Sequence, residues 1–291
     1  MVKLVEKKKI WFSISIAIIA VGIFFMATKG LNIGIDFKGG SKVVLELGND
    51  FDKQEVDEIV KSQIGDAVTN TVDETQYQIK STDLDSDKLS ELINELKEKY
   101  SLEDEILVSQ DEIGASIGKD LTEKSLTALA IAFVAMLIYI AIRFEFKSGL
   151  VALVALMHDV LITFSIYAIF DLTINSPFIA AILTIVGYSI NATIVIFDRI
   201  RENEKKPRRK SSTENANLSI NQTMKRSIYT TITTLFTIVS VYVFVPSVRE
   251  FAFPIIVGII SGGYSSVLIA PSLWVVIKNR KKSSKAKKAV A

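Results

Sequence analysis

A chain of 291 residues that is 49% hydrophobic and only 23% charged, with a mean hydropathy of +0.35, is too apolar for an ordinary water-soluble protein of this length. Its formal net charge of +2 results from 34 basic and 32 acidic residues that occupy different parts of the chain. The chain contains no cysteine, which excludes disulfides, thiolate metal sites and a cysteine nucleophile.

The apolar residues gather in six long runs, whereas a soluble core would disperse them on a helical or strand period. Each run is close to the ~20 residues that a helix needs to cross the hydrocarbon core of a bilayer. The predicted transmembrane helices are residues 10–28, 125–142, 148–170, 177–197, 227–245 and 251–277. The first run lacks a small-x-small cleavage site, so we interpret it as a retained anchor and not as a signal peptide.

The distribution of basic residues predicts the orientation. Most of the 34 Lys and Arg residues lie in residues 1–9, between the second and third spans, in the loop 198–226 and in the tail 278–291. Short basic segments stay on the cytoplasmic side, so both termini are predicted to be cytoplasmic. Basic residues near the membrane can also contact anionic lipid headgroups. The basic loop has no interleaved aromatic residues and no recognisable nucleic-acid-binding motif, so we expect no nucleic-acid partner.

The segment 29–124, between the first two spans, is predicted to be a small acidic domain on the outer face, called the lobe below. Its hydrophobic periodicity predicts strands and helices in the order β-α-β-β-α-β. These elements are predicted at residues 42–47, 52–64, 67–71, 76–80, 85–100 and 106–109, with a turn at Asp73-Glu74. The order is that of a ferredoxin-like α+β sandwich.

A glycine-rich segment follows the first span and contains Gly34, Asp36, Gly39 and Gly40. Glycines at this density are typical of a backbone that must turn or approach another chain closely. On physical grounds the segment is a turn at the membrane exit. It is not a phosphate-binding loop, because no strand precedes it and no Lys-Ser/Thr follows the second glycine at the required place.

The fourth span ends in a distinctive run, residues 187–203, which reads GYSINATIVIFDRIREN. Together with the glycine-rich segment and with residues 156–160, 222–227 and 262–266, this run resembles the SecD/SecF family, and within it the six-span SecF subunits of the bacterial Sec protein-export machinery.

The resemblance implies an α-helical protein of the bacterial inner membrane, with an RND-like half bundle of six helices that forms a complex with SecD. It also implies that the two proteins assist the SecYEG channel, pulling or releasing preproteins on the outer face with the proton motive force. One histidine, no cysteine and no serine in a nucleophile-elbow context leave no catalytic triad, zinc site or phosphate cradle. We therefore expect no enzyme activity, no metal and no cofactor.

The chain departs from the family pattern in the fourth span. SecF proteins usually have aspartate directly after the asparagine of this motif, whereas here Asn191 is followed by Ala192. The resemblance implies that this aspartate lies in the proton path, opposite the arginine that opens the fifth span, which is Arg226 here. SecD has its own carboxylate at the position of Asn191, so this chain lacks an acid at both points. The alanine is either a deliberate substitution or the mark of a lineage in which SecD or another ion pathway does this work.

The most costly residue in the predicted membrane region is Asp159, because an ionised carboxylate at mid-membrane costs about 2.5 kcal/mol or more. Asp159 and its neighbour His158 are candidates for a proton relay, or Asp159 makes a structural hydrogen bond to Ser or Thr of a neighbouring span. Adjacent helix positions diverge by ~100°, so the two side chains need not touch. Arg226 either snorkels to the interface or takes part in the relay, with Asp159 or, less favoured, Asp198 as its counter-charge.

Small residues in the spans predict close helix packing at Gly187, Gly258 and Gly262. Three functions remain open at this point. The first is an auxiliary subunit of protein export that works with SecD. The second is an RND-type half-transporter for lipids or small molecules, and the third is a scaffold for SecD that transduces no ion flow, which Ala192 motivates.

Overall fold

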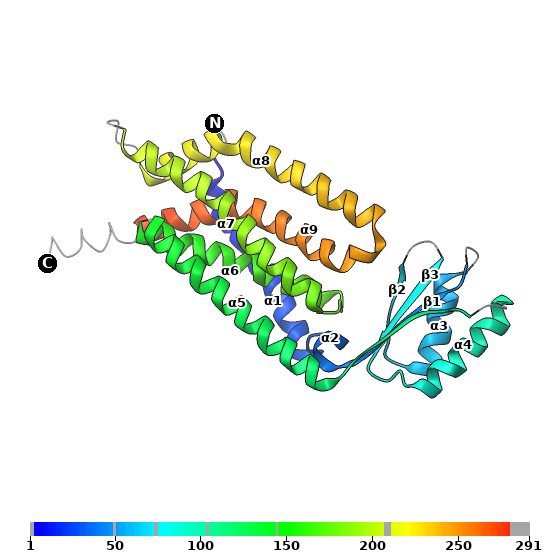
Figure 1. The fold of residues 1–291 in the computed structure, drawn as a ribbon. Helices are drawn as coiled ribbons and strands as arrows, with labels where there is room; N and C mark the ends of the chain where they lie inside the picture. Colours follow the sequence, from blue (N-terminus) through cyan, green and yellow to red (C-terminus); the bar gives the residue numbers. More distant parts are fainter. Residues whose placement is uncertain are drawn as a thin grey trace.

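A computed structural model describes residues 3–48, 51–72, 75–102, 105–143, 145–206 and 211–279. Within these residues six helices are long and apolar enough to cross a membrane (Figure 1). They are α1 (Lys8–Thr28), α5 (Ala115–Arg143), α6 (Phe146–Ile169), α7 (Ser176–Glu204), α8 (Ser212–Phe244) and α9 (Arg249–Tyr264). A π-helical turn, η3 (Ser265–Ile269), continues α9 into helical residues that run to 279.

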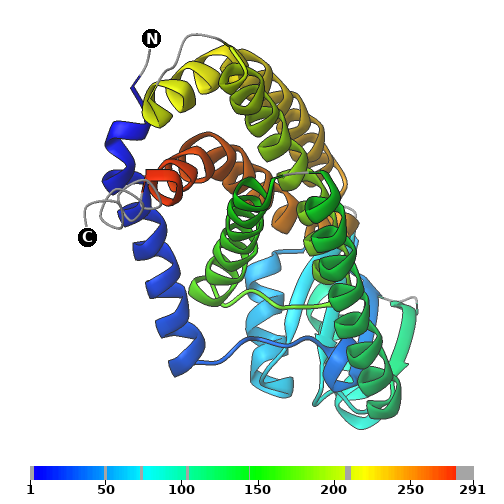
Figure 2. The same ribbon diagram turned by 90° about the vertical axis from the view of Figure 1, so that its left-hand side faces the viewer.

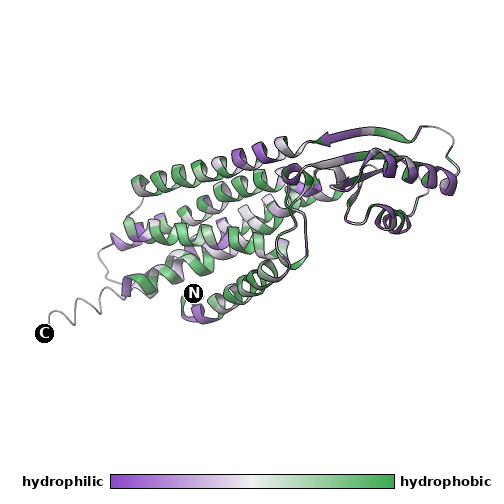
Figure 3. Cartoon of the chain, turned by 90° about the horizontal axis from the view of Figure 1, so that it is seen from below, coloured by the Kyte–Doolittle hydropathy of each residue, from purple (hydrophilic) through white to green (hydrophobic). Residues whose placement is uncertain are grey.

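The bundle is built around three of these spans. The last span, α6 and α7 are largely buried inside the protein, whereas α1, α5 and α8 leave most of their apolar surface exposed. Figure 2 shows α6 surrounded by the other helices, and Figure 3 shows that hydrophobic residues dominate the bundle while hydrophilic residues collect in the lobe and at helix ends. An apolar exterior of this kind is what a lipid environment requires.

Three helices are longer than the apolar runs predict. Helix α5 begins at Ala115, ten residues before the predicted start at 125 and inside the segment predicted as the lobe, and α7 and α8 are extended too. Helix α7 continues to Glu204 and α8 begins at Ser212, so most of the segment predicted as a basic loop, 198–226, is helical. A capping box starts α8, because the Ser211 hydroxyl accepts from the backbone N–H of Glu214 and the Glu214 side chain accepts from the N–H of Ser211. The extensions of α7 and α8 are joined by buried polar contacts, including a 2.9 Å bond from Asn203 Nδ2 to Ser219 Oγ.

The lobe has the predicted β-α-β-β-α-β order. Its elements are β1 (Gly40–Glu46), α3 (Lys53–Ile64), β2 (Val68–Val72), β3 (Gln76–Ser81), α4 (Ser86–Tyr100) and β4 (Leu107–Ile113). The strands form one antiparallel sheet in the order β2-β3-β1-β4, the ferredoxin-like arrangement. The predicted Asp73-Glu74 turn lies outside the described residues.

One face of this sheet and the two helices enclose a separate hydrophobic core around Tyr77, Leu45 and Leu92. The lobe therefore has its own packing and sits beyond the end of the bundle where α1 ends and α5 begins (Figure 1). The predicted fold class, six transmembrane helices with one ferredoxin-like α+β domain between the first two, is confirmed.

Candidate functional site

The side chain of Asp159 lies on α6 at the centre of the bundle and is 0% exposed. Its Oδ1 accepts hydrogen bonds from Ser261 Oγ at 2.6 Å and lies 2.9 Å from His158 Nδ1. Its Oδ2 accepts from Ser189 Oγ at 2.5 Å and from Ser265 Oγ at 2.7 Å. We call these five residues the carboxylate cage. The predicted structural hydrogen bond to a serine of a neighbouring span is thus confirmed, and it is made three times.

Small residues on α9 allow the cage to form. A Cβ added at Gly258 would lie 2.3 Å from Ile185 Cγ1, and one added at Gly262 would lie 3.3 Å from Ser189 Cβ, so both glycines hold α9 against α7. At Gly187, by contrast, an added Cβ would meet nothing within 4 Å, so the predicted packing role of this glycine is not seen within the described chain. The π-helical turn begins at Ser265, directly at the cage, and such turns are frequent at functional sites.

His158 connects the cage to α1. Its Nε2 lies 2.8 Å from Ser15 Oγ, and its ring stacks on that of Tyr264 with centroids 6.1 Å apart. The Tyr264 hydroxyl in turn donates to the carbonyl of Trp11 at 2.6 Å. Although adjacent helix positions diverge, His158 and Asp159 do touch, because the flexible side chains turn towards each other across the helix surface.

Arg226 is not a partner of the cage. It lies on an exposed face of α8 beside a small recess of about 50 Å³ that is also lined by Asn191 and Ala192. Among the residues that the structure describes, no carboxylate pairs with Arg226. Asp159 is occupied by the cage, and Asp198 pairs at 3.0 Å with Arg201 on its own helix. Within the described residues no ion pair joins Arg226 to Asp159 or Asp198, so the predicted replacement of the missing counter-charge stays a prediction.

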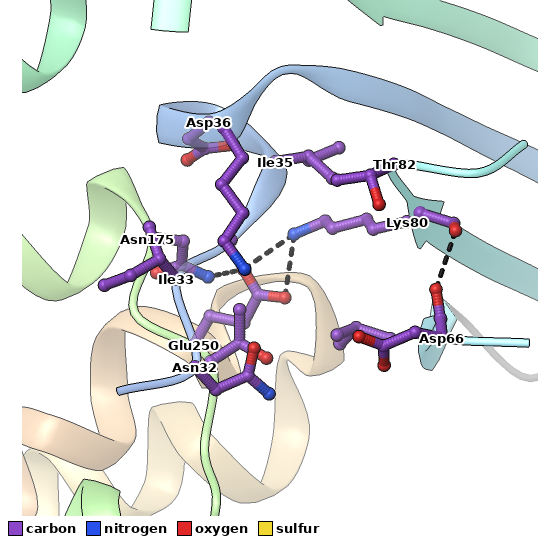
Figure 4. A pocket seen from close by; sticks show the side chains of 14 residues that line it. Asn32, Ile33, Ile35, Asp36, Asp66, Lys80, Thr82, Asn175 and Glu250 are labelled. Carbon is purple, nitrogen blue, oxygen red and sulfur yellow. Dashed lines mark hydrogen bonds and ion pairs between the residues drawn. The ribbon is translucent and has the colours of Figure 1, made fainter. Parts of the chain in front are cut away.

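A second polar cluster joins the lobe to the membrane helices (Figure 4). Glu250, in the first turn of α9, accepts from Lys80 Nζ of β3 at 2.8 Å on both carboxylate oxygens. It also accepts from Asn70 Nδ2 of β2 at 3.1 Å and from Asn175 Nδ2, at the start of α7, at 2.5 Å. We call these four residues the lobe junction. Sequence reasoning missed it, although an acidic residue in the first turn of a helix is a recognisable signal.

The glycine-rich segment lies next to this junction and is more than an exit turn. Asp36 Oδ2 accepts from the backbone N–H of Ser176 at 2.8 Å and so caps α7, while Gly34 N–H donates to the carbonyl of Ile174 at 2.8 Å. Gly40 has a φ of +144°, and a Cβ there would lie 2.6 Å from the carbonyl oxygen of Ser81. The segment thus fixes the connection between α6 and α7 to the base of the lobe.

Among the described residues no group of three or more His, Cys, Asp or Glu side chains is placed to hold a metal ion. The cage brings together one carboxylate, one imidazole and three hydroxyls.

Two family models match the chain. The SecD/SecF C-terminal domain of protein export membrane proteins matches residues 92–280, and the SecD/SecF GG motif matches residues 24–50. The chain belongs to the SecD/SecF family of protein translocase subunits. It is 36% identical to the protein translocase subunit SecF of Sebaldella termitidis, over 98% of this chain and 95% of that protein. It is also 37% identical to SecF of Acidaminococcus fermentans, over 96% of this chain and 98% of that one.

Solved structures agree with the SecD/SecF assignment. The crystal structure of SecDF from Thermus thermophilus matches with a TM-score of 0.81 and 31% identity, over 96% of this chain and 39% of that chain. SecDF in a super-membrane-facing form matches with a TM-score of 0.75. The chain spans about two fifths of the length of these SecDF chains. The chain is thus a multi-pass membrane protein of this family, and the names of these relatives support a partnership with SecD in the translocase.

Proposed function

We propose that the chain is the SecF-type subunit that works with SecD to promote preprotein export through SecYEG, driven by the proton motive force. The observation that supports this most is the carboxylate cage, because an ionisable group with 0% exposure inside a membrane bundle marks an ion pathway by default. The family membership supplies the export context.

The proposed setting is the bacterial inner membrane with both termini in the cytoplasm. The basic residues of 198–226 and 278–291 support this orientation and would face the anionic lipids of the inner leaflet. In this orientation the acidic lobe lies on the outer face, where preproteins emerge, and residues 1–9 lie inside. Spheroplast proteolysis that left the lobe intact would contradict the layout.

The export role is tested by pulse-labelling a secreted protein in a strain that lacks the chain and carries it back as wild type or as Asp159→Asn. We expect wild type to restore the rate of late translocation and Asp159→Asn to restore at most about a tenth of the stimulated rate, since each 1.36 kcal/mol of lost coupling is tenfold. Asp198→Asn is the matched control. Normal export in the null strain, with an altered lipid or drug profile, would contradict this role and favour an RND-type half-transporter.

A scaffold that transduces no ion flow is a second candidate, because Ala192 provides no acid and Arg226 has no carboxylate partner among the described residues. Ala192→Asp places an acid beside Asn191 on the wall of the recess that Arg226 also lines. If Asp159 carries the ion, the proton motive force should stimulate export in the protein with Ala192. The degree of stimulation should then change less than twofold in Ala192→Asp. Stimulation that is absent with Ala192 and appears with aspartate would support the scaffold for the chain as it stands.

A further inference from the structure

The hydrogen bonds of the carboxylate cage define which ion fits it. Each oxygen of the Asp159 carboxylate faces two potential donors, and the four distances run from 2.5 to 2.9 Å. A carboxylate has about four lone-pair sites, so the three serine hydroxyls and the imidazole saturate it when it is ionised. Filling every site lowers the cost of holding an ionised carboxylate inside the membrane.

The same distances exclude a sodium-like cation from the cage in this arrangement. Oxygens that share a hard cation sit roughly 2.3–2.6 Å from it, and hence more than ~3 Å from one another. The hydroxyls of Ser189, Ser261 and Ser265 lie 2.5, 2.6 and 2.7 Å from the carboxylate oxygens. A cation would have to push all three away, whereas a proton on the carboxylate needs only one donor to become an acceptor.

His158 is the member of the cage that can make this change. When Asp159 is ionised, Nδ1 carries a hydrogen and donates it; when Asp159 is protonated, Nδ1 accepts and Nε2 carries the hydrogen. We propose that Asp159 and His158 form a proton-binding site of the membrane domain, in which His158 passes the proton between Ser15 and the carboxylate. This deepens the proposed function, on which it rests, because it names the place where this chain holds the proton.

A groove beside the cage gives His158 its access. It has a volume of about 360 Å³, lies between α1, α6 and α9, and is lined by apolar side chains together with Ser15, His158, Ser261 and Tyr264. His158 is 8% exposed, whereas Asp159 is 0% exposed, so the imidazole stands between the groove and the carboxylate. The groove is mostly apolar, so Ser15 and His158 mark the place where a proton donor would meet the cage.

The transfer balances when a hydronium ion supplies the proton. The Ser15 hydroxyl gives its hydrogen to Nε2 and takes one from the hydronium ion, which leaves as water, while the Nδ1 hydrogen moves to Oδ1 of Asp159. One proton enters, and the pair ends as a neutral imidazole beside a neutral carboxylic acid. Tyr264 from α9 is the other titratable side chain against His158; α1 contributes the Ser15 hydroxyl and α7 the Ser189 hydroxyl to this region.

The test is a difference infrared spectrum of the full chain in lipid bilayers after a downward pH jump, in the carbonyl-stretch region of protonated carboxylic acids. We expect a band from a buried acid in wild type and in Asp198→Asn, and its loss in Asp159→Asn. Exchanging potassium for sodium at constant pH should leave the band unchanged. Survival of the band in Asp159→Asn, or its suppression by sodium, would overturn the assignment.

The role of His158 is tested by the rate at which the band appears. His158→Gln and Ser15→Ala should each slow it at least tenfold, while Tyr264→Phe, which keeps the stacked ring, should not. These variants retain Asp159, so they also test the site if Asp159→Asn does not fold. An unchanged rate in His158→Gln would refute the relay.

These spectra are independent of export. A cage that binds the proton in a strain with unaffected secretion would refute the export role and leave the proton site standing. Defective secretion in the null strain, together with no Asp159 band in the spectrum, would refute the proton site and leave the export role standing.

Discussion

Replacing Glu250 by glutamine should loosen the lobe from the membrane helices. The side chains of Lys80 and Glu250 are 16% and 23% exposed, so their ion pair lies between surface pairs, worth about 0–1 kcal/mol, and buried pairs, whose breakage costs about 3–5 kcal/mol. We expect Glu250→Gln to cost about 2 kcal/mol of docking free energy, or roughly a 30-fold change in the ratio of docked to undocked lobe. Glutamine keeps the shape but gives Asn175 and Lys80 an uncharged acceptor.

The absence of cysteine makes this loss measurable with spin labels, because no native thiol competes. Labels at cysteines introduced for Ser90 on α4 and Ser240 on α8, both exposed, report the distance from lobe to bundle by pulsed electron resonance. Glu250→Gln should add a longer, broader population. Asp120→Asn, which breaks an exposed ion pair with Lys124, is the control and should change nothing. A distance distribution in Glu250→Gln that overlays wild type would refute the reasoning.

Two further substitutions test packing and charge. Gly258→Val places a Cβ 2.3 Å from Ile185 Cγ1, so we expect a loss of about 1–3 kcal/mol, seen as a lower thermal midpoint in detergent; an unchanged midpoint would contradict the close contact. In the lobe, partial burial raises the pKa of Asp57, but hydrogen bonds from Lys53 and two hydroxyls outweigh it and lower the pKa. The ionised Asp57 therefore stabilises the lobe above the unfolded pKa of ~3.9, and this stabilisation is lost as the pH falls through the lower folded pKa. Asp57→Asn should flatten the acid dependence of hydrogen exchange in α3 and β3. An unaltered pH dependence in the variant would contradict this stabilising role of Asp57.

The six membrane spans could be predicted because charge-free runs of about 20 residues have few alternatives. The helical extensions beyond those runs could not be predicted, because a hydropathy pattern assigns polar segments to loops. Asn203 is only 7% exposed and bonds to Ser219 across the two helices, a pairing that shows only when both helices are in place. The lobe was predictable because its apolar periodicity alternates cleanly between strand and helix.

The candidate site was predictable only in part. Asp159 and His158 stand out in the sequence because a charged residue in a span needs an explanation. The three serines of the cage do not stand out in the sequence, because serine is common in membrane helices. Even Ser189 lies 30 residues from Asp159 along the chain. Family resemblance directed attention to Arg226 instead, and in this fold Arg226 is exposed, whereas Asp159 is fully buried.

Helices α7 and α9 each contact both polar clusters. Helix α7 has its N-cap Asn175 at the lobe junction and Ser189 at the cage, about 21 Å apart along the helix. Helix α9 has Glu250 and Ser261 in the same roles, about 17 Å apart. Because Gly258 packs directly on α7, the two helices should shift together when the hydrogen bonds of Asp159 change.

The ion pair between Lys80 and Glu250 is one of the contacts through which the lobe would follow such a shift. Glu250→Gln should therefore widen the distance distribution of the lobe and leave the infrared band of Asp159 in place, which separates the transmission of the signal from the binding of the proton. Loss of the band in Glu250→Gln would mean that the two clusters are one thermodynamic unit, and the lobe would then influence proton binding as strongly as the proton influences the lobe.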